Sequence, residues 1–179
     1  EKGFVSYHQD AKYIGLEPHN WVTAWVAITD SNENNGCMRM WSGSHKKDLK
    51  DHDQMFNEGN LLTKGQTVND VPTNQTIPLI LKAGQISLHH PTVVHGSDLN
   101  KSNDRRIGFV IQSYIGTDVK QVVGKNSVQL ARGIDEFNYH NSICRPKSLM
   151  DKNDLKVKKQ ENDNLQEIFY AGSQKKGQY

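Results

Sequence analysis

Short apolar runs separated by polar turns occupy the first two thirds of this 179-residue chain. Residues 21–28 (WVTAWVAI) form an apolar run of β-branched and aromatic side chains, which predicts a buried strand. Residues 106–115 (RIGFVIQSYI) give the clearest strand signal of the chain. Similar, shorter runs predict strands at 4–8, 37–41, 77–81, 86–90 and 92–95. Many short strands with turn residues between them indicate an all-β sandwich or barrel with minor helices.

The pattern changes in two other stretches of the chain. Residues 46–76 are polar and lack a clear period, which is typical of a lid or an irregular excursion. Residues 151–170 predict a helix with Leu165, Ile168 and Phe169 on one stripe, and the tail from Ser173 is predicted to be loose. We therefore expect a core over 1–140 and a partly helical extension over 141–179. The first candidate site residue lies only seven residues from Glu1, so we also expect the natural protein to contain a segment before it.

Composition limits the classes of function. The formal net charge is only +2, with both signs interspersed, so neither nucleic acid nor a membrane is predicted as a partner. Apolar residues make up 35% of the chain, no run is long enough to span a bilayer, and no signal peptide is visible. Two cysteines are too few for a disulfide framework, which favours the cytoplasm. A small-molecule substrate fits this composition, and the sequence makes no prediction of oligomeric state.

Three residues form a candidate metal site. His8 and Asp10 are two residues apart at the end of a predicted strand, where alternate side chains share a face. His95 follows another predicted strand and would be the third ligand. Two histidines and one carboxylate leave coordination positions open for O2 and a cosubstrate, as in non-heme Fe(II) oxygenases. The competing interpretation of His8 and Asp10 is a surface histidine beside a turn, and His89 and His90 compete with His95.

Arg106 is a candidate anchor for a carboxylate. The polar loop 98–104 is predicted to join the strand of His95 to that of Arg106 as a hairpin, which would bring Arg106 near the metal. A guanidinium binds a carboxylate through two parallel hydrogen bonds, which lysine cannot do. Arg105 is the rival, but alternation places Arg106 on the side opposite the apolar Ile107 and Phe109.

Several blocks resemble the phytanoyl-CoA dioxygenase family, closest to its bacterial members, over roughly residues 4–140. They are His8-Gln9-Asp10, Thr23-Ala24-Trp25, 33–39 (ENNGCMR), 43–46 (GSHK), and His95-Gly96-Ser97 followed by Asn100 and Arg106. The resemblance implies a double-stranded β-helix (jelly-roll) fold, Fe(II) and 2-oxoglutarate, with hydroxylation of a C–H bond by O2. It places iron on His8, Asp10 and His95, and 2-oxoglutarate against Arg106 and Ser97, with Gln9 and Trp25 lining the same pocket. Trp25 as a core residue and Gln9 facing outward are the alternatives.

The sequence departs from this family in two places. Its N-terminal segment is absent here, and Trp41-Ser42 stands where relatives carry an aliphatic residue and proline. Asp10 is present, whereas halogenases of the family have a small residue there, so halogenation is not expected. Two other classes of function are compatible with the metal residues: a zinc-dependent isomerase or hydrolase of cupin-like fold, and a non-catalytic metal-binding barrel. The isomerase or hydrolase does not require an arginine at position 106 as an anchor for a second carboxylate, and the intact set of three metal residues argues against the non-catalytic barrel.

Overall fold

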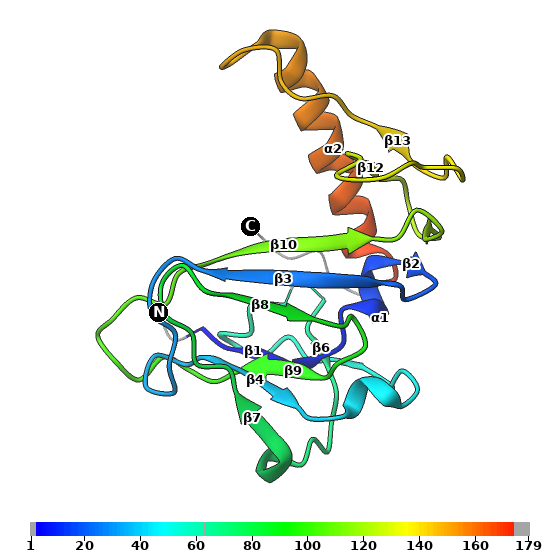
Figure 1. The fold of residues 1–179 in the computed structure, drawn as a ribbon. Helices are drawn as coiled ribbons and strands as arrows, with labels where there is room; N and C mark the ends of the chain where they lie inside the picture. Colours follow the sequence, from blue (N-terminus) through cyan, green and yellow to red (C-terminus); the bar gives the residue numbers. More distant parts are fainter. Residues whose placement is uncertain (1–2, 63, 174–179) are drawn as a thin grey trace.

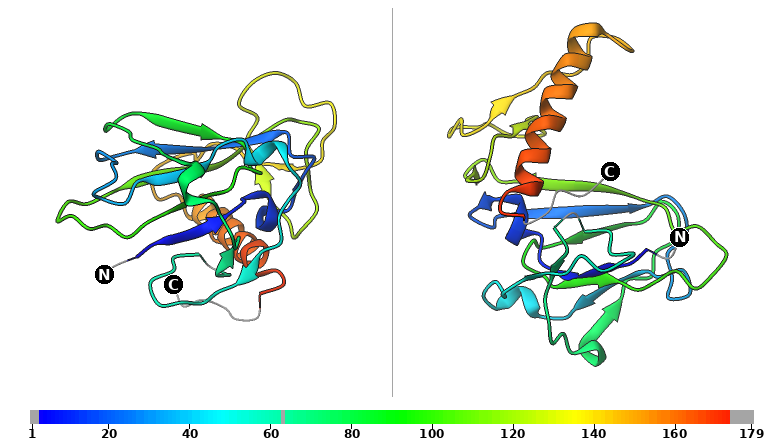
Figure 2. Two further views of the ribbon diagram at one scale, coloured as in Figure 1. Left: turned by 90° about the horizontal axis from the view of Figure 1, so that it is seen from below. Right: turned by 180° about the vertical axis from the view of Figure 1, so that it is seen from behind.

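Two antiparallel sheets face each other in the computed structural model, which describes residues 3–62 and 64–173. One sheet has the order β1 (Val5–His8), β9 (His95–Ser97), β4 (Met38–Trp41), β7 (Thr76–Pro78). The other has the order β10 (Gly108–Ile115), β3 (Trp21–Ala27), β8 (Ile86–His89). Figure 1 shows them as two layers, and the view from behind in Figure 2 agrees. The all-β prediction with minor helices is confirmed, and the arrangement is that of a jelly roll.

Most predicted strands are present, and one is displaced. The apolar run at 21–28 is β3, and the run at 86–90 is β8. The strand predicted at 92–95 is wrong, because the amide of Val93 donates to the carbonyl of His90 and closes a turn there. β9 instead begins at His95 and continues to Ser97, so His95 is the first residue of its strand.

The predicted hairpin between β9 and β10 is also wrong. β9 pairs with β1 and β4, whereas β10 pairs with β3, so the loop over 98–104 carries the chain from one sheet to the other. Arg106 nevertheless reaches the end of β9, because the two sheets face each other across the interior. Its side chain donates to the hydroxyl of Ser97 at 3.2 Å.

The stretch over 46–76 is held against the first sheet instead of forming an open excursion. η1 (Ser44–Lys46) leads into it, and it contains the hairpin of β5 (Asp53–Gln54) and β6 (Gln66–Thr67) and then η2 (Thr73–Gln75). The amide of Val68 donates to the carbonyl of Tyr7 at 2.7 Å, which fixes this stretch beside β1. Residue 63 lies outside the described residues.

An apolar cluster lies where α1 (Ala11–Ile14) meets the end of the three-stranded sheet. Ile14, Leu16, Trp21 and Val119 are its larger members, each at most 5% exposed. β2 (Leu16–Glu17) pairs with β11 (Lys120–Gln121) beside it. The cluster anchors α1, which directly follows the candidate metal residues His8 and Asp10.

The predicted C-terminal helix is present as α2 (Lys152–Tyr170), and Figure 1 shows most of it projecting away from the two sheets. Its N-cap is Asp151, whose side chain accepts from the amides of Asn153 and Asp154. Its last turn packs near α1, where Ile168 is buried and the ring of Phe169 lies 6.3 Å from that of Tyr13. The short parallel pair β12 (Ser127–Val128) and β13 (Asn141–Ser142) lies beside the helix.

The boundary predicted at residue 140 stays a prediction, and the predicted loose tail over 174–179 lies outside the described residues. Among the helices of the described chain, none combines the length and apolar character needed to cross a membrane.

Candidate metal centre and cosubstrate pocket

Strand register brings His8 and His95 together. The two residues are directly opposite each other in the antiparallel pair β1–β9, and their rings are 4.3 Å apart between centroids. Side chains at such cross-strand positions lie on the same face. The pairing is close because Gly96 lacks a side chain: a Cβ there would lie 2.8 Å from the carbonyl oxygen of Val5.

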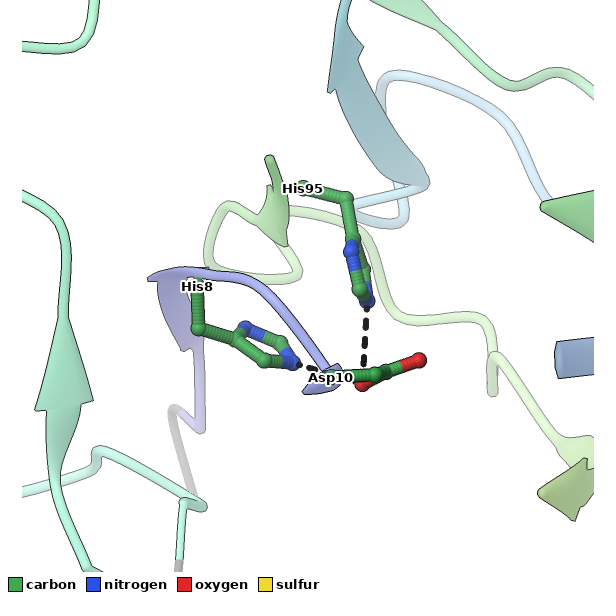
Figure 3. A group of neighbouring side chains, drawn as sticks. All are labelled: His8, Asp10 and His95. Carbon is green, nitrogen blue, oxygen red and sulfur yellow. Dashed lines mark ion pairs between the residues drawn. The ribbon is translucent and has the colours of Figure 1, made fainter. Parts of the chain in front are cut away.

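Asp10 completes the group by a different route from the predicted one. β1 ends at His8, and Asp10 has helical dihedral angles as the N-cap of α1, so the two do not alternate along one strand. The chain turns after His8 and carries the carboxylate back over the two imidazoles (Figure 3). The Oδ1 atom of Asp10 is 3.4 Å from His8 Nε2 and 3.8 Å from His95 Nε2. One ligand atom from each residue lies within 4.8 Å of the others, and all three residues are buried.

Hydrogen bonds fix which ring nitrogens face the centre. His8 Nδ1 lies 2.8 Å from the carbonyl oxygen of Ser6, and His95 Nδ1 lies 3.1 Å from that of Val93. A carbonyl only accepts, so each Nδ1 carries the proton and each Nε2 presents a lone pair toward Asp10. This donor set, two imidazole nitrogens and one carboxylate, fits a divalent metal ion.

Burial sets the charges of the group. Burial lowers the pKa of His95 to about 3, so this imidazole is neutral at neutral pH and free to bind a metal. Burial by itself would raise the pKa of Asp10, but the facing imidazoles of His95, His8 and His89 outweigh it and hold that pKa well below its ordinary value. The centre therefore combines a negative charge with free nitrogen lone pairs.

Two hydroxyl groups orient the Asp10 carboxylate. The Thr23 hydroxyl donates to Oδ2 at 2.7 Å, and the Tyr13 hydroxyl donates to Oδ1 at 2.9 Å. Sequence reasoning assigned neither Thr23 nor Tyr13 to the metal centre. A polar residue within the apolar run of β3, on the same face as Trp25, was the available signal for Thr23.

A cavity of about 180 Å³ extends from the three residues to Arg106. Ser97 follows His95 by two residues on β9, a separation of about 7 Å along a strand. Arg106 donates to Ser97 and its guanidinium carbon lies 5.9 Å from the centre of the Trp25 ring. Arg105 is exposed, so the structure orients Arg106 inward, as alternation predicted.

Glycine at position 108 makes room for Trp25 in this pocket. A Cβ on Gly108 would lie 2.0 Å from an indole carbon of Trp25, so any other residue would displace the ring. Trp25, Ser97 and Arg106 all line the cavity.

Gln9 does not line the cavity. Its side chain donates to the carbonyl of Thr92 at 2.6 Å and accepts from the amide of Lys50 at 2.9 Å. It is fully buried and joins three segments behind the metal residues. We therefore leave Gln9 out of the proposed cosubstrate site.

Comparisons with known proteins identify the family of this chain. The profile of the family described as Phytanoyl-CoA dioxygenase (PhyH) matches residues 1–108, more than half of the chain. The chain belongs to the phytanoyl-CoA dioxygenase family. It is 31% identical to the peroxisomal phytanoyl-CoA dioxygenase of Mus musculus over 135 residues, which is 73% of this chain and 39% of that protein. The Homo sapiens enzyme is 33% identical over 101 residues, 55% of this chain and 30% of that protein. The chain thus spans about two fifths or less of these relatives.

Solved structures of similar fold include one that is described as a non-heme monooxygenase. The non-heme monooxygenase ThoJ in its apo form matches with a TM-score of 0.80 and 29% identity, over 94% of this chain and 61% of ThoJ. The ThoJ–Ni complex matches with a TM-score of 0.70 and 28% identity, over 92% of this chain and 58% of that one. EvdO2 of Micromonospora carbonacea, complexed with 2-oxoglutarate, matches with a TM-score of 0.51 and 20% identity, over 61% of this chain and 44% of that one. The last likeness concerns the fold alone.

Proposed function

We propose that this phytanoyl-CoA dioxygenase family member is an Fe(II)- and 2-oxoglutarate-dependent dioxygenase that hydroxylates a C–H bond of a small organic molecule. The observation that carries the proposal is the buried group of His8, Asp10 and His95 with both Nε2 atoms directed at one carboxylate oxygen. Membership of the family and the existence of a nickel complex of the similar protein ThoJ support metal binding by this chain.

His8, Asp10 and His95 would hold the iron. The bound ion with 2-oxoglutarate supplies the oxidising chemistry: one atom of O2 enters the substrate C–H bond as hydroxyl, and 2-oxoglutarate becomes succinate and CO2 with the other atom. The fixed Nδ1–H groups of His8 and His95 keep their Nε2 atoms directed at the metal position. The hydroxyls of Thr23 and Tyr13 keep the Asp10 carboxylate facing it.

The far end of the cavity suits the second carboxylate of 2-oxoglutarate. Arg106 would bind that carboxylate through two charge-assisted hydrogen bonds, and Ser97 would add a hydroxyl donor. The separation of about 7 Å between His95 and Ser97 along β9 matches the length of a five-carbon dicarboxylate. Trp25 would close this end of the pocket and exclude water.

Anaerobic titration tests the proposed function. Fe(II) and 2-oxoglutarate added together to the purified protein should produce a visible charge-transfer band, and admission of O2 should release succinate. Asp10→Ala should abolish both signals, whereas Asp30→Ala, which removes an exposed carboxylate paired with Lys82, should change neither. Absence of the band and of succinate in the wild-type protein would refute the assignment.

The cellular location is also part of the proposal. Cys37 is buried, Cys144 is exposed, and both are free thiols. Because free thiols persist in a reducing compartment, we propose the cytoplasm, which fractionation of the source cells can check.

A further inference from the structure

A third imidazole faces the proposed metal centre. His89 is the last residue of β8, is only 6% exposed, and lines the cavity. Its ring lies 4.7 Å from that of His95 between centroids. In the described part of the chain its Nε2 atom is buried without a hydrogen-bond partner. An unpartnered buried polar group costs stability, so a role for this nitrogen is expected.

That nitrogen lies within ion-pair distance of the Asp10 carboxylate. His89 Nε2 lies 3.6 Å from Oδ2, the carboxylate oxygen that also accepts from Thr23. Oδ1, in contrast, is the oxygen close to His8 and His95. The two oxygens of the Asp10 carboxylate therefore face different groups: Oδ1 faces His8 and His95, and Oδ2 faces Thr23 and His89.

The other ring nitrogen of His89 indicates its tautomer. Nδ1 lies 3.3 Å from the hydroxyl of Ser87, which can donate to it. A carboxylate oxygen accepts hydrogen bonds only, so a proton on Nε2 satisfies Asp10 while the Ser87 hydroxyl satisfies Nδ1. At 3.6 Å the contact with Asp10 is longer than a hydrogen bond, and a movement of about 0.6 Å would complete one.

We propose that His89 is a positioning residue that acts through Asp10. With the metal bound, its Nε2–H and the Thr23 hydroxyl together hold Oδ2, so that Oδ1 alone is presented to the ion. The coordination positions that a second carboxylate oxygen would occupy then stay open for the cosubstrate and O2. This inference rests on the proposed function, because it requires a metal on His8, Asp10 and His95.

The geometry favours this role over that of a fourth ligand. Within the described residues, the group whose ligand atoms all lie within 4.8 Å of one another contains His8, Asp10 and His95 but not His89. His89 approaches the oxygen that faces away from the other two imidazoles. A hydrogen-bond partner of this kind changes metal affinity by about 10- to 100-fold when it is removed.

Two isosteric substitutions of His89 separate the roles. The amide of Gln reaches the position of Nε2 and keeps the donor, whereas the amide of Asn reaches only the position of Nδ1. We expect His89→Asn to weaken Co(II) binding by about 10- to 100-fold in anaerobic calorimetry, and His89→Gln to stay within about threefold of wild type. His89→Phe, which removes the donor but keeps a ring, should behave like Asn. His90→Gln is the matched control, because His90 is the next residue and is exposed.

The visible spectrum of bound Co(II) distinguishes a positioning residue from a ligand. We expect the same spectrum for wild type and His89→Asn at saturating metal, because the ligands are unchanged. A spectrum showing the loss of a nitrogen ligand would overturn the inference, as would equal affinity of all variants.

Wild-type protein that binds no Co(II) would refute the proposed function as well, whereas normal wild-type binding with unaffected variants would refute this inference alone. A fall in the melting temperature of the metal-free variants without a change in affinity would mark a purely structural role and contradict the inference.

Discussion

The two faces of the β10–β3–β8 sheet differ in a way that is opposite to the usual pattern. The inner face carries Thr23 and His89, which are register partners, and both are at most 6% exposed. On the outer face, Val26 of β3 is paired with Phe109 of β10 on one side and with Ile86 of β8 on the other. Phe109 is 61% exposed and Ile86 is 54% exposed. On the same three strands, the polar Thr23 and His89 are thus buried while the apolar Phe109 and Ile86 are exposed.

This inversion shows which face carries the function. Burial of polar groups costs free energy unless they are paired, and an exposed single apolar side chain needs no explanation. The inner face keeps histidine, serine and threonine because they surround a carboxylate and a cavity. Perturbation of the inner face should therefore change binding, whereas perturbation of the outer face should change little.

Removal of one imidazole from the centre should have the largest effect. His95→Ala leaves two ligands where three are required, so Co(II) binding should fall below detection in a titration that measures micromolar affinities. The matched change His90→Ala, at an exposed histidine of the following turn, should leave binding unaltered. Retention of tight binding by His95→Ala would place the metal elsewhere.

Arg106→Ala should weaken 2-oxoglutarate binding by about 3–6 kcal/mol, because it removes two charge-assisted hydrogen bonds that contribute about 1.5–3 kcal/mol each. Metal affinity should stay within about threefold, because Arg106 lies at the other end of the cavity from Asp10. Calorimetry with Co(II), then with 2-oxoglutarate, measures both. Arg105→Ala, one residue away and exposed, is the control. An equal fall in both affinities would contradict the assigned role of Arg106.

Gly108→Ala should destabilise the protein by about 1–3 kcal/mol, because the new Cβ would lie 2.0 Å from the Trp25 ring. Urea unfolding measures the loss. Adding Trp25→Leu should recover part of it by removing the clash. If the loss of unfolding free energy in the double variant equalled the sum of the losses in the two single variants, the contact between position 108 and Trp25 would not be the cause of the destabilisation.

Acid should destabilise the metal-free protein through His95. The pKa of this residue is about 3 when folded and about 6.5 when unfolded, so the unfolded chain binds more protons between these values. The free energy of unfolding should therefore fall as the pH is lowered from 6.5 toward 3, by at most about 1.4 kcal/mol per pH unit from this group. Urea unfolding across this range, compared with His95→Gln, isolates the contribution. Equal slopes in the two proteins would contradict it.

The outer face should give the smallest effect. Phe109→Thr and Leu88→Thr replace exposed apolar side chains by threonine, a residue that suits a β-strand. The free energy of unfolding should therefore change by about 0.5 kcal/mol or less in each variant. Metal and 2-oxoglutarate affinities should not change. A loss above about 1.5 kcal/mol at either position would mean that this face is covered in solution.

Local patterns were enough to predict most strands and the inward orientation of Arg106. Alternation over the predicted strand at 106–115, of which β10 covers Gly108–Ile115, separates Arg106 from Arg105 without knowledge of the partner strands. The long apolar run of β3 and the stripe of α2 are equally local signals. These are the features for which spacing in the sequence determines direction in space.

Pairing between distant segments could not be predicted in the same way. The polar loop before Arg106 fits either a hairpin or a crossing between sheets, and only the partners of β9 and β10 decide which. Gln9 lies between two inward residues in the sequence, and its side chain contacts Thr92 and Lys50 at the point where the strand ends and Asp10 caps α1. Thr23 and His89 gain their roles from a carboxylate that lies on another part of the chain.

A crystal structure of the protein with Mn(II) and 2-oxoglutarate, grown without O2, tests the central claim most directly. We expect one anomalous peak about 2.0–2.3 Å from His8 Nε2, His95 Nε2 and Asp10 Oδ1, with the distant carboxylate of 2-oxoglutarate on Arg106. Manganese bound only at the surface, or 2-oxoglutarate bound away from Arg106, would contradict the account.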